Sequence, residues 1–523
     1  MRKRKLVLLS RCVFTGTQEQ PFNGFVSLCG NLIEAVGPAA EAPSFIAAAD
    51  ETRDLGNCTL MPGLIDVHTF FSGWLLRRLG ADCAPATDAE QIIQSLKCWA
   101  ADHERSMAAI GHDLPNDLLQ GDGRTTLETA LEEGFGDKPA VVFASNGTTC
   151  AMNAAAVSRY GFSPECCYSE KLWRLIAECL ALPEAGSVYS KYMRMLNARG
   201  VTSIKEMSFD DYYGFATEMK KKEDDDDLSI RVSMMSQPVG RGLDLAYARD
   251  AQQRFSGSFV RFSGFNRMID RGVAAGLAEM IQPYEKSAVA GAAGRTVIEN
   301  PDWPLIEQEV RAGDAEGFRF SLHCQGDGAV RHTVGLLDSL TKNSAGRLRC
   351  RHAITDLENT DPRDLVRFGR MGGICEVYPQ IFMLDPREEC VAMMRRQIGE
   401  QRLRRSWNRR AMFDSGCVVC CGTDLPLLLP DIGDSIYCAC GGRFADGRSF
   451  NSQNTCSISE LLGAWTAGGA YDLEREHDIG TLESGKLADI CVLDRNLFAL
   501  DSTAAREARI VLTISDGRIV YES

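Results

Sequence analysis

The sequence lacks both the long apolar runs and the basic excess that mark two large classes of protein. No stretch reaches the ~18 consecutive apolar residues of a membrane-spanning helix. The net charge of −14 disfavours binding to nucleic acid or to an anionic membrane, since both need clusters of Lys and Arg. We therefore expect neither nucleic acid nor a membrane as a partner.

The sequence also lacks a clear export signal. The start MRKRKLVLLS joins basic residues to an apolar run, but that run is short and no small-residue cleavage site follows. We predict a first β-strand there. The 20 cysteines are then reduced thiols, and we expect a cytoplasmic protein. Cys417 and Cys420 have zinc-like spacing, yet residues three apart on a strand face opposite sides, so we interpret them as buried apolar residues.

The middle of the chain has no low-complexity linker and no repeat of fixed period, but short apolar strands alternate with amphipathic segments there. Examples are GVTSIKEMS, FRFSLHCQGD and GCVVCCGTD. Such alternation indicates parallel βαβ units, and seven or eight in succession predict an α/β fold, a (β/α)₈ TIM barrel, over residues 61–479. A mostly helical pattern at about 75–190 indicates an insert. Residues 1–60 and 480–523 read as short strands, which predicts a composite β-sandwich domain built from both ends of the chain.

Histidine is scarce, and its placement is informative. Only seven occur in 523 residues, and His68, His323 and His352 each stand at the end of an apolar segment, as Asp424 also does. The active site of a TIM barrel lies where its strands end. Three imidazoles and a carboxylate can bind one divalent metal and leave a position for water. A hydrogen-bonded structural role is the alternative for any one of them. We interpret the other histidines as structural or surface residues: His103, His112, His332 and His477.

Several motifs in order resemble the amidohydrolase superfamily, and within it the YtcJ-like branch, the amidohydrolase 3 family. LMPGLIDVHTF is similar to that family's xxPGFIDSHxH, SLHCQGDGAV to HxIGDxA, RCRHAI to RIEHA, and CCGTDLP to xGSDxP. The segment GTLESGKLADICVLD with the terminal ISDGRIVYES resembles the shared end of amidohydrolases. The resemblance covers nearly the whole chain. It implies hydrolysis of C–N bonds, usually in amides, by a metal-activated water.

Carried over by position, the resemblance assigns roles to four residues. His323 and His352 would be metal ligands from the fifth and sixth strands, with a part in catalysis. Asp424, from the eighth strand, would be both metal ligand and general base. His68 would be the remaining half of the first-strand pair.

The departures from the family pattern concern the metal. Phe70 stands where the second first-strand histidine belongs. Arg261 lies at about the place of a lysine that is carboxylated in some members to bridge two metals. Arginine stays protonated and forms no carbamate, so we expect no binuclear site. A mononuclear site and an empty or repurposed pocket both stay open.

Further departures concern the substrate. Asn146 and Thr148 replace an aspartate and a histidine of the insert, and Arg351 replaces a glutamate before His352. We expect Arg261, Asn146, Thr148 and Glu376 to contact the substrate, with Arg261 suited to an anionic group through paired hydrogen bonds. Glu376 has three alternatives: an ion pair with Arg261, a replacement carboxylate at the altered site, or a surface ion pair.

The leading hypothesis is a hydrolase of a small-molecule amide or related non-peptide C–N bond, using one divalent metal, zinc first. One alternative is a catalytically weak or inactive amidohydrolase-like protein with a ligand-binding or regulatory role. Another is a metal-free lyase or isomerase that uses Asp424, His323 and His352 as acid and base. A homodimer is the expected assembly, as the commonest state of soluble oligomers.

Overall fold

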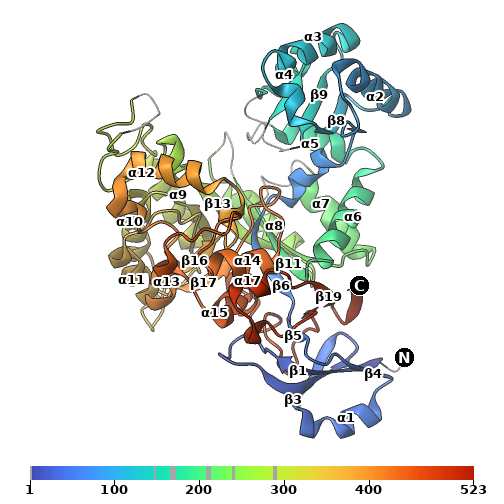
Figure 1. Ribbon diagram of the computed structural model, residues 1–523, viewed down its shortest axis with the longest axis vertical. Helices are drawn as coiled ribbons and strands as arrows, with labels where there is room; N and C mark the ends of the chain where they lie inside the picture. Colours follow the sequence, from blue (N-terminus) through green and yellow to red (C-terminus); the bar gives the residue numbers. More distant parts are fainter. Residues whose placement is uncertain (1–2, 146–148, 165–171, 208–213, 238–241, 287–290) are drawn as a thin grey trace.

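Eight parallel strands form a closed barrel in the computed structural model, which describes residues 3–145, 149–164, 172–207, 214–237, 242–286 and 291–523 (Figure 1). In barrel order they are β6 (Leu64–Thr69), β11 (Val201–Glu206), β12 (Arg231–Ser236), β13 (Val260–Met268), β14 (Phe320–His323), β15 (Ala353–Thr355), β16 (Ile374–Val377) and β17 (Val418–Cys421). The ring closes where the amide of Asp424 donates to the carbonyl of His68 at 2.9 Å. The predicted (β/α)₈ barrel is confirmed.

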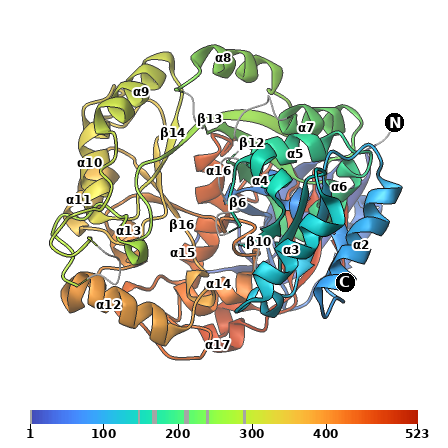
Figure 2. The same cartoon turned by 90° about the horizontal axis from the view of Figure 1, so that it is seen from above.

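Helices surround the barrel and cover its outer face (Figure 2). They are α7 (Phe215–Asp224), α8 (Leu245–Arg254), α9 (Trp303–Glu316), α10 (Asp327–Asp338), α11 (Pro362–Arg370), α12 (Arg387–Leu403), α13 (Arg409–Asp414), α14 (Ile432–Ala439), α15 (Ile458–Gly463) and α16 (Gly469–Asp472). Strands covered on both faces read as continuous apolar runs, which is why the barrel strands are visible in the sequence. No helix in the described ranges is long and apolar enough to cross a membrane.

Strands from both ends of the chain share one sheet below the barrel in Figure 1. They are β1 (Lys5–Val13), β2 (Phe22–Cys29), β3 (Leu32–Pro38), β4 (Glu51–Asp54), β5 (Thr59–Pro62), β18 (Ile490–Leu493), β19 (Ile510–Ser515) and β20 (Arg518–Glu522). The sheet joins the two ends where β18 pairs antiparallel with β5. Leu8, Val26, Ile490 and Leu512 belong to one buried cluster, so residues nearly 500 positions apart pack together. Two short helices, α1 (Pro43–Ala48) and α17 (Ser502–Ala505), complete the terminal segments.

The segment between β6 and β11 contains the expected helices together with a sheet of its own. Its helices are α2 (Ala89–Asp102), α3 (Gly123–Phe135), α4 (Ala154–Tyr160), α5 (Trp173–Leu180) and α6 (Ala185–Asn197). Its strands, in the order β10-β9-β8-β7, are β7 (Ala81–Asp82), β8 (Ala109–Leu114), β9 (Ala140–Ala144) and β10 (Cys150–Met152). Two of these strands have only two or three residues, too short for a strand pattern to be recognised in the sequence.

A buried arginine ties the barrel to the terminal sheet. Arg231 opens β12 and is 1% exposed. Its guanidinium makes two hydrogen bonds to Asp489, at 2.7 and 3.1 Å, and one to Asp516 at 2.9 Å. Because Asp489 precedes β18 and Asp516 lies in the turn between β19 and β20, one cation fixes three elements. Its charge is offset by two carboxylates, as burial of a guanidinium requires.

Replacing this arginine is expected to destabilise the whole protein. In Arg231→Met, Asp489 and Asp516 lose their partner, and removal of one member of a buried ion pair costs about 3–5 kcal/mol. The free energy of unfolding from chemical denaturation measures the loss. Arg254→Met, which removes a largely exposed pair with Asp250, is the control and should stay within about 0.5 kcal/mol of the parent. Equal effects of the two substitutions would contradict the role of Arg231.

Candidate active site

Four titratable side chains meet at the carboxyl end of the barrel. His68 lies at the end of β6, His323 ends β14, Asp356 follows β15 and Asp424 follows β17. The φ angles of Asp356 and Asp424 are 63° and 52°, in the left-handed region that residues other than glycine seldom adopt. Backbone strain of this kind gathers at functional sites, because the surrounding structure must hold it in place. The strained strand ends make this end of the barrel the candidate site.

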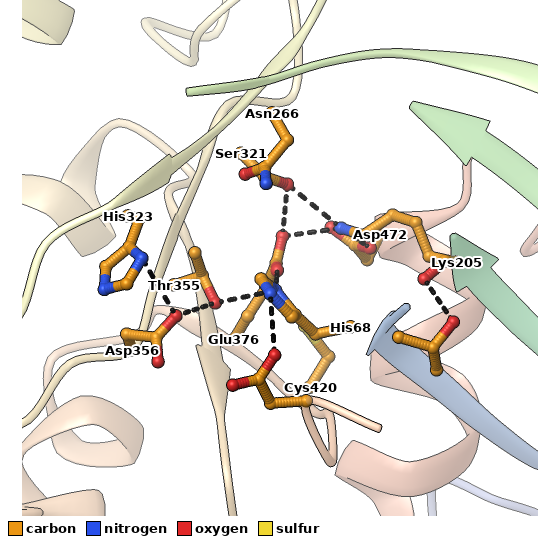
Figure 3. A network of polar contacts seen from close by, with 12 residues as sticks. His68, Lys205, Asn266, Ser321, His323, Thr355, Asp356, Glu376, Cys420 and Asp472 are labelled. Atoms are coloured by element: carbon orange, nitrogen blue, oxygen red, sulfur yellow. Dashed lines mark hydrogen bonds and ion pairs between the residues drawn. The ribbon is translucent and has the colours of Figure 1, made fainter. Parts of the chain in front are cut away.

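His68 lies at the centre of the group. Its Nδ1 is 3.1 Å from the Thr355 hydroxyl and 3.4 Å from Glu376 Oε2, while its Nε2 is 3.8 Å from Asp424 Oδ1 (Figure 3). Burial alone would lower the pKa of His68. The hydrogen bond with Glu376 and the charges of Asp356 and Asp424 outweigh burial and raise that pKa. His68 is therefore held in one orientation and inclined to be cationic.

The pKa of His323 shifts in the opposite direction, downwards. Its Nδ1 is 3.7 Å from Asp356 Oδ2, and the same carboxylate oxygen accepts a hydrogen bond of 2.8 Å from the Tyr378 hydroxyl. Burial lowers the pKa of His323 more than Asp356 raises it. Among the described residues, Nε2 of His323 has no hydrogen-bond partner although it is buried. A neutral imidazole with one free nitrogen can bind a metal or accept a proton.

Asp424 is a partly exposed carboxyl, with 27% of its side chain accessible, and its pKa lies close to neutrality. Burial raises the pKa of Asp424 to about 7, the charge of His68 opposes that rise, and Asp356 and Asp66 add to it. Asp66 is buried on β6 and accepts hydrogen bonds from the Thr423 hydroxyl at 2.5 Å and the Thr423 amide at 3.1 Å. A general base works best with a pKa near the operating pH. Asp424 meets that condition.

A layer of buried charges lies inside the barrel and supports His68. Lys205 on β11 donates to Glu376 at 2.5 Å, to Asp472 at 2.5 Å and to the Ser321 hydroxyl at 3.1 Å. The side chains of Lys205, Glu376 and Asp472 are 0% exposed. Burial would raise the pKa of Glu376, but the charges of Lys205 and His68 lower it, so Glu376 stays ionised. The carboxylate of Glu376 thus bridges the Lys205 ammonium and the His68 imidazole.

Glu376 differs from the sequence-based expectation. The sequence predicts a substrate contact, with an ion pair to Arg261, a replacement carboxylate at the site or a surface ion pair as alternatives. The structure instead places Glu376 in the barrel interior with Lys205, where its side chain has no exposed surface. Neither Lys205 nor Asp472 stood out in the sequence. Lys205 donates a hydrogen bond to Glu376 and another to Asp472. Lys205 lies in β11, whose six residues are all buried, and a lysine inside a predicted barrel strand is the signal that could have revealed the network.

Arg261 lies far from the site, contrary to the prediction. It is the second residue of β13, near the amino end, and its Nη2 is 3.4 Å from Asp478. At the carboxyl end of this nine-residue strand Met268 pairs with His323, and at ~3.3 Å per residue this end lies about 23 Å along the strand from Arg261. The error arose because the strand continues well beyond Arg261. Asn266 is the β13 residue that Figure 3 labels beside the network, and its side-chain amide donates to Gln237 at 3.1 Å.

The structure also contradicts the strand-end position predicted for His352. This residue precedes β15, so Thr355 and Asp356 occupy the carboxyl end instead. Nδ1 of His352 accepts a hydrogen bond from the Phe320 amide, and Nε2 donates to Asp314, both at 3.1 Å. Burial lowers the pKa of His352. Both ring nitrogens are engaged within the protein core, which gives the ring a structural role.

Three other predicted positions complete the comparison. Asn146 and Thr148 lie outside the described residues. Arg351 makes two hydrogen bonds to Glu476, at 2.8 and 2.6 Å, and its guanidinium lies 4.0 Å from the ring centre of Tyr471. Arg351 therefore belongs to a side-chain cluster with these two residues.

The residues at the barrel mouth suit a single divalent cation in chemical type. Among the described residues, two groups of three bring ligand atoms within 4.8 Å of one another: Asp314, Cys350 and His352, and Asp82, His112 and Asp113. Neither group includes the mouth residues. His68, His323 and Asp424 nevertheless offer a free buried nitrogen and a carboxylate in a pocket with an acidic excess. Phe70 lies with its ring centre 5.8 Å from that of His68, where a second imidazole was expected, and supplies no ligand.

Comparison with known sequences identifies the family of the chain. A sequence profile of the amidohydrolase family matches residues 51–521. The chain belongs to the amidohydrolase family. The putative amidohydrolase YtcJ of Bacillus subtilis is 21% identical over 518 residues, with 90% of each chain covered. The protein LONG AFTER FAR-RED 3 of Arabidopsis thaliana is 20% identical over 562 residues, with 99% of this chain and 91% of the plant protein covered.

The same fold occurs in a solved structure. The crystal structure of an uncharacterized metal-dependent hydrolase from Pyrococcus horikoshii OT3 superposes with a TM-score of 0.71 at 17% identity. The superposition covers 95% of this amidohydrolase chain and 99% of the archaeal chain. Since identity is this low, the likeness concerns the arrangement of the barrel and its added sheets.

Removing Lys205 is expected to disrupt the support of the site. Lys205→Met removes the cation that contacts both Glu376 and Asp472 at 2.5 Å. Arg319 stays close to Asp472, at 2.5 Å, but is 3.9 Å from Glu376, so we expect a cost of about 3–5 kcal/mol in unfolding free energy. Chemical denaturation followed by circular dichroism measures this cost. Lys220→Met removes the one-third exposed lysine that pairs with Asp224 on α7 and should cost under about 0.5 kcal/mol. Equal unfolding free energies of the two variants would contradict the stabilising role of the buried network.

Proposed function

We propose that this amidohydrolase hydrolyses a small-molecule amide or a related non-peptide C–N bond, with one divalent metal held at the barrel mouth. Zinc is the first candidate for that metal. The observation that carries the proposal is the buried, unpartnered Nε2 of His323 at the mouth that also holds Asp424, a carboxyl with a pKa of about 7. Nitrogen and oxygen donors in one acidic pocket are a donor set that zinc accepts.

His68, His323 and Asp424 are the residues that would hold the ion. A divalent ion supplies Lewis acidity, which lowers the pKa of water and polarises a substrate carbonyl. His68 is oriented for this by Thr355 and Glu376. His323 is oriented by Asp356, which Tyr378 holds in turn. Such outer partners fix the direction of ligand rings and account for much of a site's affinity.

Asp424 performs the proton transfer in this proposal. Attack of water on the carbonyl carbon releases a proton, which the Asp424 carboxylate accepts. When the C–N bond breaks, the same carboxyl returns that proton to the leaving nitrogen, so the amine departs neutral. Partial burial raises the pKa of Asp424 to about 7, so Asp424 can both take and return the proton.

Metal content tests the proposal directly. The parent protein, purified without chelator, is expected to hold close to one equivalent of zinc, manganese or iron by elemental analysis. His323→Ala should lose most of that metal because it removes the free nitrogen donor. His477→Ala, at a 91% exposed position, is the matched control and should keep it. Less than about a tenth of an equivalent in the parent, unchanged after metal supplementation, would refute the mononuclear hydrolase.

Position 70 tests the geometry of the first strand. Phe70→His adds a second imidazole beside His68 and should tighten metal binding by at least about tenfold, or about 1.4 kcal/mol. Competition with a chromophoric chelator gives the dissociation constant. Phe70→Leu is the control, since it changes shape without adding a donor, and should leave the constant within about a factor of three. No tightening in the histidine variant would mean that position 70 does not face the metal.

A second candidate function is ligand binding without turnover. It is favoured by one observation: His68, His323 and Asp424 are not among the described groups whose ligand atoms lie within 4.8 Å of one another. A protein that binds an amide but holds no metal would have this function. The metal analysis of the parent protein separates the two candidates.

A further inference from the structure

A cavity of about 160 Å³ lies beside the candidate site and shares part of its wall. The shared residues are Asp356 and Tyr378, whose hydroxyl and carboxylate are hydrogen bonded at 2.8 Å. Tyr378 also contacts His68, with ring centres 5.5 Å apart. A molecule in the cavity would therefore lie one side chain away from His68 and His323.

The rest of the wall is dominated by aromatic and sulfur-containing side chains. Phe382 and Phe444 stack with ring centres 4.5 Å apart, and Trp407 meets Phe382 edge-on at 5.3 Å. Met394 and Met412 also line the space and are buried. Methionine adapts its shape and makes favourable contacts with aromatic rings. The wall suits a flat apolar group.

Asp385 lines the cavity from an exposed position, while two other charged groups on the wall, Glu358 and Arg409, are engaged by the protein. Glu358 accepts a hydrogen bond from the Val273 amide at 3.2 Å. Arg409 donates to the carbonyls of Tyr378 and Pro379, at 3.2 and 3.4 Å. Since these two charges have partners, the free surface of the cavity is chiefly apolar, and a charged ligand would gain little from it.

Two polar atoms of the wall are not engaged. Within the described chain, Oε1 of Gln325 and Nε of Arg409 are buried and have no hydrogen-bond partner. Buried polar atoms without partners are uncommon in folded proteins, and each one calls for an explanation. One acceptor and one donor on the wall of a single cavity suit a bound molecule that carries polar atoms next to its apolar part.

The size of the cavity limits what it can take. An apolar cavity of about 150 Å³ holds one benzene molecule, whereas pockets for drug-sized ligands have about 300–1,000 Å³. We infer that this cavity binds a single ring-sized apolar group of the substrate. The substrate class is then an amide with a phenyl or similar group close to the scissile C–N bond. This inference rests on the proposed hydrolase function for its link to the C–N bond.

Binding of a matched pair of amides tests the inference without turnover. N-Benzylacetamide should bind at least about tenfold more tightly than N-methylacetamide, because only the former has a ring to bury. Titration calorimetry of the full-length protein measures both constants. Ala274→Leu, on the cavity wall, should abolish the preference by filling the space. Ala275→Leu, exposed in the same short turn (Val273–Ala275), should preserve it.

The outcomes separate this inference from the proposed function. Met393→Phe fills the cavity from a half-buried position and gives a second test if Ala274→Leu does not fold. Equal affinities for the two amides, or a preference that survives both filling variants, would overturn the cavity assignment. Hydrolysis of both amides with equal kcat/KM would also overturn it and leave the hydrolase standing. A preference abolished by filling, without hydrolysis of either amide, would support the cavity and count against the hydrolase.

Discussion

The contact between Lys205, Glu376 and Asp472 is the interaction on which the site depends. Three charges with no exposed surface occupy the interior of the barrel, and each is costly to bury alone. Because Lys205 neutralises Glu376, that carboxylate remains ionised and turns its other oxygen towards His68. The imidazole is thereby fixed from below, and its second nitrogen faces Asp424. Lys205 therefore sets the orientation of His68 at the mouth indirectly, through Glu376.

The same arrangement gives two histidines different protonation tendencies. His68 faces carboxylates on more than one side, and its pKa rises despite burial. His323 has one carboxylate at 3.7 Å, and burial lowers its pKa. Groups of one type whose environments push their pKa values apart are the mark of an acid–base site. The pair thus offers one imidazole that tends to be cationic and one that tends to be neutral, beside Asp424, whose pKa is raised to about 7.

Whether the sequence placed a site residue correctly depended on where the strand of that residue begins and ends. The barrel was predictable because covered strands are apolar and short, and His68, His323 and Asp424 stand at the ends of such strands. Arg261 and His352 were misplaced because a motif does not reveal whether a residue opens or closes its strand. β13 continues to Met268, and β15 begins only after His352. Boundaries of this kind are set by pairing with neighbouring strands, which one sequence does not display.

Phe70 changes the character of the site as well as the number of its ligands. Its ring lies on one edge of His68, and the ring of Tyr378 meets His68 in a similar edge-on manner. Both rings leave the imidazole of His68 with apolar neighbours beside its contacts with Thr355 and Glu376. Phe70 therefore removes a metal ligand and at the same time adds aromatic surface at the mouth, next to a cavity whose wall is aromatic as well.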